Sequence, residues 1–347
     1  MRTTWIIRAA VLASMLASIS FAGEIVKDRK SGDIPARANP PHWDQVMVEA
    51  RIFLGRLPAA MPGSERDTPE QITLGKRLYF ERGISHNMTQ SCNDCHFLDK
   101  GRAGVDNTPT AKGDAGEVGK RNSPTVINAG FETVLFWDGR APDLAEQAKG
   151  PVLNPIEMGM KSPAEVVERL RKIEGYPKAF SRAFPNDPDP MTYDHIAAAI
   201  AAFERTLVAP SRCDQLLAGR EDALTPQEKR GLAAFVENSC IECHTGPTVG
   251  GRVFRKIGEH RPYENSADLG RYEITKKDED RQVFRVPMLR NVTRTKPYFH
   301  HGEVATLDEA VKLMGELQLD VELSPETISD IVAFLGSLEG NPAVDLE

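Results

Sequence analysis

Long apolar runs and cysteines are both scarce in this sequence. No run of about eighteen consecutive apolar residues occurs in the 347 positions, so we expect no membrane span in the mature chain. Alternation of apolar and polar residues, typical of half-buried strands, is nearly absent. Cysteine occurs 5 times, so a regular pattern among so few residues is improbable by chance. The remaining composition is globular, with 40% apolar and 27% charged residues, and the net charge of −7 argues against nucleic acid as a partner.

Four of the five cysteines lie in two C-x-x-C-H motifs, Cys92–His96 and Cys240–His244. This spacing is typical of covalent c-type haem, because two thiols can add to one porphyrin while the next imidazole binds the iron. A zinc site is the alternative, but each His directly follows its second Cys and no further Cys pair completes four ligands. We therefore expect two covalently bound haem c groups, attached through Cys92, Cys95, Cys240 and Cys243, with His96 and His244 as iron ligands.

Haem attachment of this kind takes place outside the cytosol, and the N-terminus is consistent with export. Arg2 and Arg8 precede the apolar stretch Ala9–Phe21, and Ser20-Phe21-Ala22 forms a small-x-small cleavage site. We expect residues 1–22 to be a signal peptide and the mature protein to be soluble and periplasmic. Cys213 is then the only cysteine left, which excludes a disulfide within the chain. A buried apolar role is expected for it, with a reactive thiol as the alternative.

A weak internal repeat precedes the two haem motifs. Thr68-Pro69-Glu70-Gln71 and Thr225-Pro226-Gln227-Glu228 each place Thr at a helix N-cap, Pro at the first helical position and Gln or Glu at the third. Ser324-Pro325-Glu326-Thr327 begins a third, amphipathic helix. Each haem motif should therefore follow a well-capped helix.

The remaining helices and turns complete a mainly α prediction. Helices are expected over residues 163–171 and 193–207, and turns over residues 101–119, 185–190 and 261–268. We predict two cytochrome-c-like helical domains, each with one covalently bound haem c, which span residues 23–212 and 213–347 and join near residues 208–222.

Several ordered motifs surround the haem motifs. They are Arg121–Thr125, Phe136–Arg140, Gln147–Pro151 and Glu157–Gly159 after the first, and Val286-Pro287, Leu289–Val292 and Pro297–His300 after the second. From about Thr68 to Leu338, the chain resembles the bacterial dihaem cytochrome c peroxidase and MauG family. The resemblance implies a peroxidase that reduces hydrogen peroxide to water at the N-terminal haem. Electrons would enter at the C-terminal haem from a small cytochrome c or cupredoxin.

The resemblance also implies catalytic residues around the first haem. Glu157 matches the distal Glu, Gln147 would line the distal pocket with Pro151 in its wall, and Trp137 would lie between the haems. The residues around Glu157 are apolar and rich in proline, and desolvation in such a setting raises a carboxyl pKa toward working pH. The alternatives are a surface Glu and a tryptophan that only packs in the core.

Ligands of the second haem and of a calcium ion follow from the same resemblance. Met314 matches the axial methionine, with Met288 as its alternative, and His300 would lie beside this haem. The family also binds Ca²⁺ through an Asn side chain and backbone carbonyls, and the matching positions are Asn122, Thr295 and Pro297. An Asn in that place is equally at home in a turn.

One loop departs from the family pattern. Many dihaem peroxidases close the resting first haem with a loop histidine, whereas this sequence has Asp114 there and no histidine from Gly113 to Gly119. We expect an open first haem, with closure by His86 or Met88 as the alternative. Two other functions stay open: a MauG-like enzyme that oxidises residues of a partner protein, and a dihaem electron carrier without catalysis. A homodimer is also compatible with the sequence.

Overall fold

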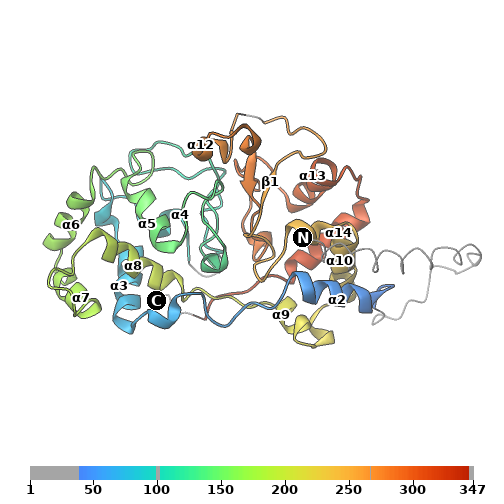
Figure 1. The fold of residues 1–347 in the computed structure, drawn as a ribbon, viewed down its shortest axis with the longest axis horizontal. Coiled ribbons are helices and arrows are strands. Elements are labelled where there is room, and N and C mark those ends of the chain that lie inside the picture. Colours follow the sequence, from blue (N-terminus) through green and yellow to red (C-terminus); the bar gives the residue numbers. More distant parts are fainter. Residues whose placement is uncertain (1–38, 99–101, 266, 344–347) are drawn as a thin grey trace, which may run out of the picture. The chain divides into compact units, whose positions relative to one another are not determined.

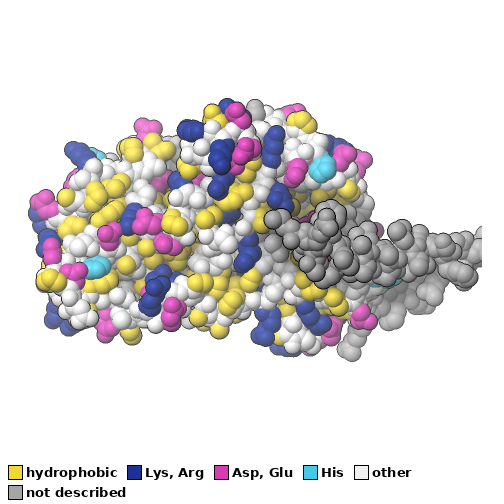
Figure 2. Space-filling model, in the orientation of Figure 1, with side chains coloured by type: hydrophobic (Ala, Val, Ile, Leu, Met, Phe, Trp, Pro, Cys, Tyr) yellow, Lys and Arg dark blue, Asp and Glu magenta, His cyan; other side chains and the backbone are white. Residues whose placement is uncertain are grey.

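The computed structural model describes residues 39–98, 102–265 and 267–343 (Figure 1). They belong to one compact unit, Asn39–Glu347, and the expected signal peptide lies outside the described residues. The architecture is mainly helical, which confirms the mainly α part of the predicted fold class. Among the described residues, no helix is long and apolar enough to cross a bilayer. On the visible face, acidic and basic side chains alternate with apolar ones (Figure 2).

The helices between residues 69 and 204 share one apolar core. They are α3 (Pro69–Tyr79), α4 (Cys92–Cys95), α5 (Leu144–Leu153), α6 (Pro163–Lys172), α7 (Tyr176–Ala183) and α8 (Tyr193–Glu204). Leu78, Phe180 and Phe203 are fully buried in this core. Helix α8 ends three residues earlier than expected. The Thr206 hydroxyl donates to the Phe203 carbonyl at 2.6 Å, and this local bond replaces the helical pattern.

A second core gathers the C-terminal helices and one helix from the beginning of the chain. They are α2 (Trp43–Phe53), α9 (Arg212–Leu217), α10 (Pro226–Glu237), α11 (Cys240–Cys243), α13 (Leu307–Leu319) and α14 (Pro325–Gly336), and the short α12 (Tyr272–Thr275) lies in a nearby loop. Cys213 is buried here, as expected, and burial raises the pKa of its thiol to about 12. Helix α9 occupies the segment expected to join two domains, and the boundary at residues 212 and 213 stays a prediction.

Two short strands, β1 (Phe254–Lys256) and β2 (Val283–Arg285), form an antiparallel pair in which Phe254 lies opposite Arg285. This pair was not predicted from the sequence, since three residues are too few to show an alternating pattern. Its position matters for the site described below, because Arg285 is the last residue of β2.

The internal repeat is present as two equivalent helix crossings. Gly75 on α3 lies against the Ala199 carbonyl of α8, and Gly231 on α10 lies against the Asp330 carbonyl of α14. A Cβ atom at either glycine would lie 1.8 Å from that oxygen. Only glycine therefore permits these crossings. The capping boxes at Thr68 and Thr225 and the N-cap at Ser324 are confirmed.

Candidate functional site

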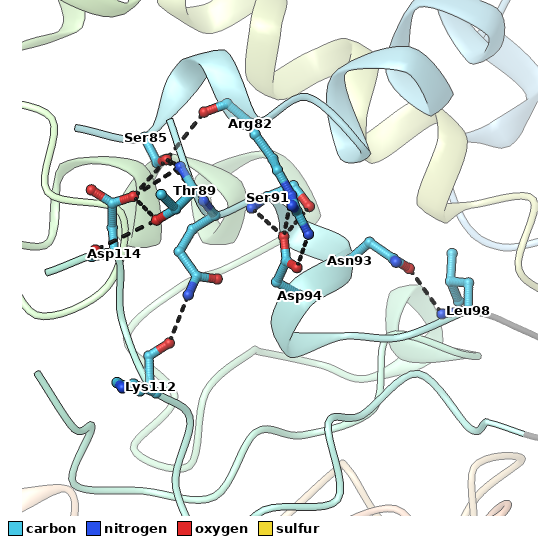
Figure 3. Close-up of polar contacts among 10 residues, drawn as sticks. Arg82, Ser85, Thr89, Ser91, Asn93, Asp94, Leu98, Lys112 and Asp114 are labelled. Atoms are coloured by element: carbon cyan, nitrogen blue, oxygen red, sulfur yellow. Dashed lines mark hydrogen bonds and ion pairs between the residues drawn. The ribbon is translucent and has the colours of Figure 1, made fainter. Parts of the chain in front are cut away.

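The first haem motif is held by the two residues between its cysteines. Asp94 accepts hydrogen bonds from the Ser91 amide and hydroxyl at 2.8 and 2.7 Å, which caps α4, and from Arg82 at 2.6 Å (Figure 3). Asn93 accepts a bond from the Leu98 amide at 3.0 Å after the motif. These bonds fix the backbone on both sides of the thiols.

The motif opens onto a cavity of about 510 Å³, within the range of cofactor sites. The residues that the sequence assigned to the first haem all line this cavity: Cys92, Cys95, His96, Trp137, Gln147, Pro151 and Glu157. They come from three separate segments of the chain. The fold therefore places two thiols, an imidazole and an acid around one enclosed space.

The histidines of both motifs are suited to bind iron. Nδ1 of His96 and Nδ1 of His244 are buried without a hydrogen-bond partner, and burial lowers the pKa of both imidazoles, that of His244 to about 4. A neutral imidazole is the form that binds a metal. All five cysteines are free thiols, and burial raises the pKa of Cys95 and Cys240 to about 12. The donor set in each motif thus fits a haem c.

Glu157 is the acid at the cavity wall. Burial raises its pKa above the usual 4.5 and outweighs the opposing effects of Arg140 and of a 3.0 Å hydrogen bond from the Asn154 amide. A carboxyl group with a raised pKa keeps its proton to higher pH than an exposed one, which suits acid–base chemistry. Asn154 follows directly after α5, the helix that carries Gln147 and Pro151. Its bond to Glu157 therefore ties the acid to the end of the helix that carries these two cavity residues.

Arginines form the charged part of the lining. Arg121 bonds Asp138 and Asp268, each at 2.6 Å, and Arg140 bonds Asp138 at 2.8 Å. Arg285 pairs with Glu132, and both side chains are only 3% exposed. Arg121, Asp138 and Arg140 lie in the ordered motifs but had no role assigned from the sequence, and Glu132 was not indicated at all. Guanidinium groups bind carboxylates well, so this lining suits the two propionate groups of a haem.

Glu204 was also missed at the sequence level. It lies at the end of the apolar helix α8, is 3% exposed and lines the cavity, and its Oε2 has no hydrogen-bond partner. Burial raises its pKa to about 8 despite the nearby Arg205. An acid inside an apolar helical stretch was the available indication.

Trp137 connects the cavity to His300. Its indole nitrogen donates to the Asn122 carbonyl at 2.9 Å, and the Asn122 amide donates to the His300 carbonyl at 2.7 Å. The Trp137 and His300 rings lie edge to face, 6.3 Å apart. His300 is 2% exposed and stacks on Phe284, with ring centres 4.0 Å apart. Trp137, which the resemblance places between the haems, is therefore a direct neighbour of His300, which it places beside the second haem.

The second haem motif lies on α11. His244 has Phe235 of α10 as a ring neighbour at 6.2 Å. Met314 is half-buried on α13, whereas its alternative Met288 is 9% exposed and packs its backbone against the Gly250 turn. Met288 thus has the environment of a core methionine, whereas Met314 is partly exposed.

Asp114 does not line the cavity. Its carboxylate accepts hydrogen bonds from Ser85 and Thr89 at 2.9 and 2.6 Å, so it faces another loop (Figure 3). Met88, one of the alternative ligands, is 65% exposed, and neither it nor His86 lines the cavity.

Hydrogen bonds of residues 107–109 connect the segments that carry the residues matched to a calcium site. The Asn122 amide nitrogen donates to the carbonyls of Thr108 and Pro109 at 2.9 and 3.2 Å, which turns its Oδ1 the other way. Asn107 bonds the carbonyls of Arg294 and Lys296, on either side of Thr295. No cluster of three or more His, Cys, Asp or Glu that could hold a metal occurs in the described part of the chain. A cation here would depend on amide and backbone oxygens, which Ca²⁺ accepts.

Comparison with known proteins agrees with this site. Residues 69–222 match the family model described as di-haem cytochrome c peroxidase. Cytochrome c551 peroxidase of Pseudomonas aeruginosa is 45% identical over 276 residues, which cover 78% of this chain and 79% of the relative. Methylamine utilization protein MauG of Methylorubrum extorquens is 34% identical and covers 90% of each chain.

Solved structures give the same result. The crystal structure of a MauG-like protein associated with microbial copper homeostasis superposes with a TM-score of 0.72 at 28% identity, over 90% of this chain and 96% of that one. The chain therefore belongs to the dihaem cytochrome c peroxidase family, to which MauG is also related.

Proposed function

We propose that this chain is a periplasmic dihaem peroxidase that reduces hydrogen peroxide to water. Peroxide would react at the N-terminal haem, and electrons would enter at the C-terminal haem from a small cytochrome c or cupredoxin. The observation that carries the proposal is the shared cavity, in which Glu157, with its raised pKa, lies with Gln147 and His96. Membership of the family makes the chain an oxidoreductase.

The chain's own residues would move the proton. Cys92, Cys95 and His96 would hold the haem, which would supply the redox chemistry for reducing peroxide. Glu157 would accept a proton from one peroxide oxygen and return it to the other, which leaves as water. The amide of Gln147 would orient the bound peroxide by a hydrogen bond. Overall, two electrons and two protons convert one peroxide into two water molecules.

Replacement of Glu157 tests this proposal. Glu157→Gln should keep both haems and their absorption spectra but slow the reaction with peroxide by about 10²–10⁴-fold, the usual contribution of a general acid–base group. The measurement is stopped-flow mixing of the ferric protein with peroxide, with and without prior one-electron reduction. Glu168→Gln, on the exposed side of α6, is the control. Unchanged turnover in Glu157→Gln would remove this residue from the mechanism.

The loop at Asp114 supports an open first haem. Its carboxylate is occupied by hydrogen bonds to Ser85 and Thr89, and no histidine is present in residues 113–119 to close the iron. We expect the ferric protein to react with peroxide without prior reduction. An electron paramagnetic resonance spectrum with only low-spin ferric signals would contradict this.

A second function is favoured by the same loop and by the MauG relative. In this alternative, the open haem and peroxide would oxidise residues of a partner protein. Met314, if it binds the second iron, favours the simple peroxidase. Peroxide consumption sustained by a reduced small cytochrome c or cupredoxin supports the first function, and its absence with such donors supports the second.

We also propose a Ca²⁺ ion bound by Asn122 Oδ1 and the carbonyls of Thr295 and Pro297. The orientation of the Asn122 amide supports it. Metal analysis of the purified protein before and after a calcium chelator should find one ion per chain, and a chain free of calcium as purified would refute this site.

A further inference from the structure

Three chain segments meet behind Glu157. They are the Ser85–Thr89 turn, the loop at Gly113 and Asp114, and Ile156–Met158. The Asp114 amide donates to the Glu157 carbonyl at 2.7 Å, and the His86 amide donates to the Met158 carbonyl at 2.8 Å. Both neighbours therefore hold the backbone that carries the Glu157 side chain.

The Asp114 carboxylate joins two of these segments. Its Oδ1 accepts from the Ser85 hydroxyl at 2.9 Å and from the Thr89 hydroxyl and amide at 2.6 and 3.2 Å (Figure 3). Its Oδ2 accepts from the Asn87 amide at 2.5 Å. Burial alone would raise the pKa of Asp114. The bonds from Thr89, Asn87 and Ser85 outweigh burial and lower it, so the group is ionised at neutral pH.

The loop lies tightly against Glu157. A Cβ atom at Gly113 would lie 2.2 Å from the Ile156 carbonyl oxygen and 2.8 Å from that of Glu157. Arg169 of α6 holds the far side of the turn through a 2.6 Å bond to the Ser85 carbonyl. A shift of the loop would therefore be transmitted to the backbone of Glu157.

We propose that Asp114 is a positioning residue for Glu157, whose carboxylate fixes the loop on the Ser85–Thr89 turn while its amide holds the Glu157 carbonyl. The inference rests on the proposed role of Glu157. It also explains why the group is an acid. All four bonds come from donors, three to Oδ1 and one to Oδ2. An asparagine would replace one of these oxygens by a nitrogen that cannot accept, and its remaining oxygen would carry no charge.

Hydrogen exchange tests the structural part without reference to activity. In the haem-loaded protein, Asp114→Asn should speed amide exchange in residues 85–90 and 113–119 by roughly tenfold or more, since bonds to a charged acceptor are lost. Glu117→Gln changes the same charge on the same loop, and no side-chain contact of Glu117 is seen; its exchange should equal that of the wild type. Equal exchange in Asp114→Asn would overturn the proposal.

A double-mutant cycle tests the link to Glu157. Asp114→Asn should slow the peroxide reaction roughly tenfold or more in the wild type, but by less than about twofold in the Glu157→Gln background, because the group to be positioned is then absent. Thr89→Val keeps the shape of the side chain but removes the hydroxyl that donates to Asp114. It should also slow the peroxide reaction in the wild type.

The outcomes separate the two proposals. Equal slowing by Asp114→Asn in both backgrounds would mean a general structural role and overturn the positioning role. If the single variant Glu157→Gln reacts with peroxide at the wild-type rate, the proposed function is refuted, and the positioning role with it. This holds even if Asp114→Asn shows the expected faster amide exchange.

Discussion

Glu157 and Glu204 line the same cavity, but their surroundings differ. Glu157 has Asn154 and Arg140 to favour its charge, whereas the buried Oε2 of Glu204 has no hydrogen-bond partner. An isolated buried carboxylate is costly, so the pKa of Glu204 rises from the usual 4.5 to about 8. At the residue scale, the fold thus gives two buried acids of one cavity different surroundings, and only Glu157 has groups that favour its charged form.

Glu204 should make stability depend on pH. Its folded-state pKa of about 8 exceeds the usual 4.5, so the folded state binds the proton more tightly. Stability is then complete below about pH 4.5, falls as pH rises, and reaches its lowest level above about pH 8. Glu204→Gln should flatten this part of the profile in urea unfolding of the haem-loaded protein. Glu237→Gln, an exposed acid, is the control, and a slope that persists in Glu204→Gln would contradict the assignment.

Met314 makes a second prediction at this scale. If its thioether binds the second iron, Met314→Ala should abolish the far-red absorption band of ferric His/Met haem, because the sixth ligand is lost. Met288→Ala, at the core methionine, should keep the band. The measurement is a ferric absorption spectrum. If the band is lost in Met288→Ala but kept in Met314→Ala, Met288 is the iron ligand instead of Met314.

The sequence predicted the members of the first site better than their supports. Short motifs named Cys92, His96 and Glu157, because attachment and acid–base chemistry require particular residue types. The role of Asp114 depends on partners 25 to 29 positions away, and Glu204 depends on burial between helices. Such contacts arise only when distant segments pack together, so no local pattern contains them.

At the element scale, the main features are the two close helix crossings, of α3 with α8 and of α10 with α14. The capping patterns correctly predicted where α3, α10 and α14 begin, since a cap needs only neighbouring residues. Helix α2 was missed because no side chain caps it at His42, and α5 because Pro151 lies inside it. The close contact at Gly75 and Gly231 involves a second helix, so the sequence could not show it.

Alanine at the crossings should destabilise the fold. Gly75→Ala and Gly231→Ala each place a methyl group 1.8 Å from a carbonyl oxygen, so the helices must separate. The cost of overpacking, about 1–3 kcal/mol or more, exceeds the gain of about 1 kcal/mol from replacing a helical glycine. Gly336→Ala on α14 has no atom within 4 Å and should show only the gain. Denaturant unfolding compares the three variants. Equal stability of all three would refute the steric argument.

At the scale of the whole molecule, Trp137, Asn122 and His300 link the two halves of the sequence. The chain of contacts runs from the lining of the first cavity to a buried histidine before α13. Sequence motifs named these residues, but the link between them depends on the tertiary fold.

Trp137 should govern electron transfer between the haems. Trp137→Phe should slow it, because phenylalanine is harder to oxidise and cannot donate to Asn122, while both haem spectra stay unchanged. Rapid mixing of the half-reduced protein with peroxide measures the rate. Trp43→Phe, in the other core, is the control. An unchanged rate in Trp137→Phe would leave the indole with a packing role only.

The pair of Arg285 and Glu132 has a consequence for any attempt to divide this protein. Both charges are almost completely shielded from water, and each is provided by a different half of the chain. A fragment that ends near residue 212 would contain Glu132 without its counter-charge, and a buried acid in that state must either become protonated or draw in solvent. The two fragments, expressed separately, should therefore fold poorly, and folding of either half should require the intact polypeptide.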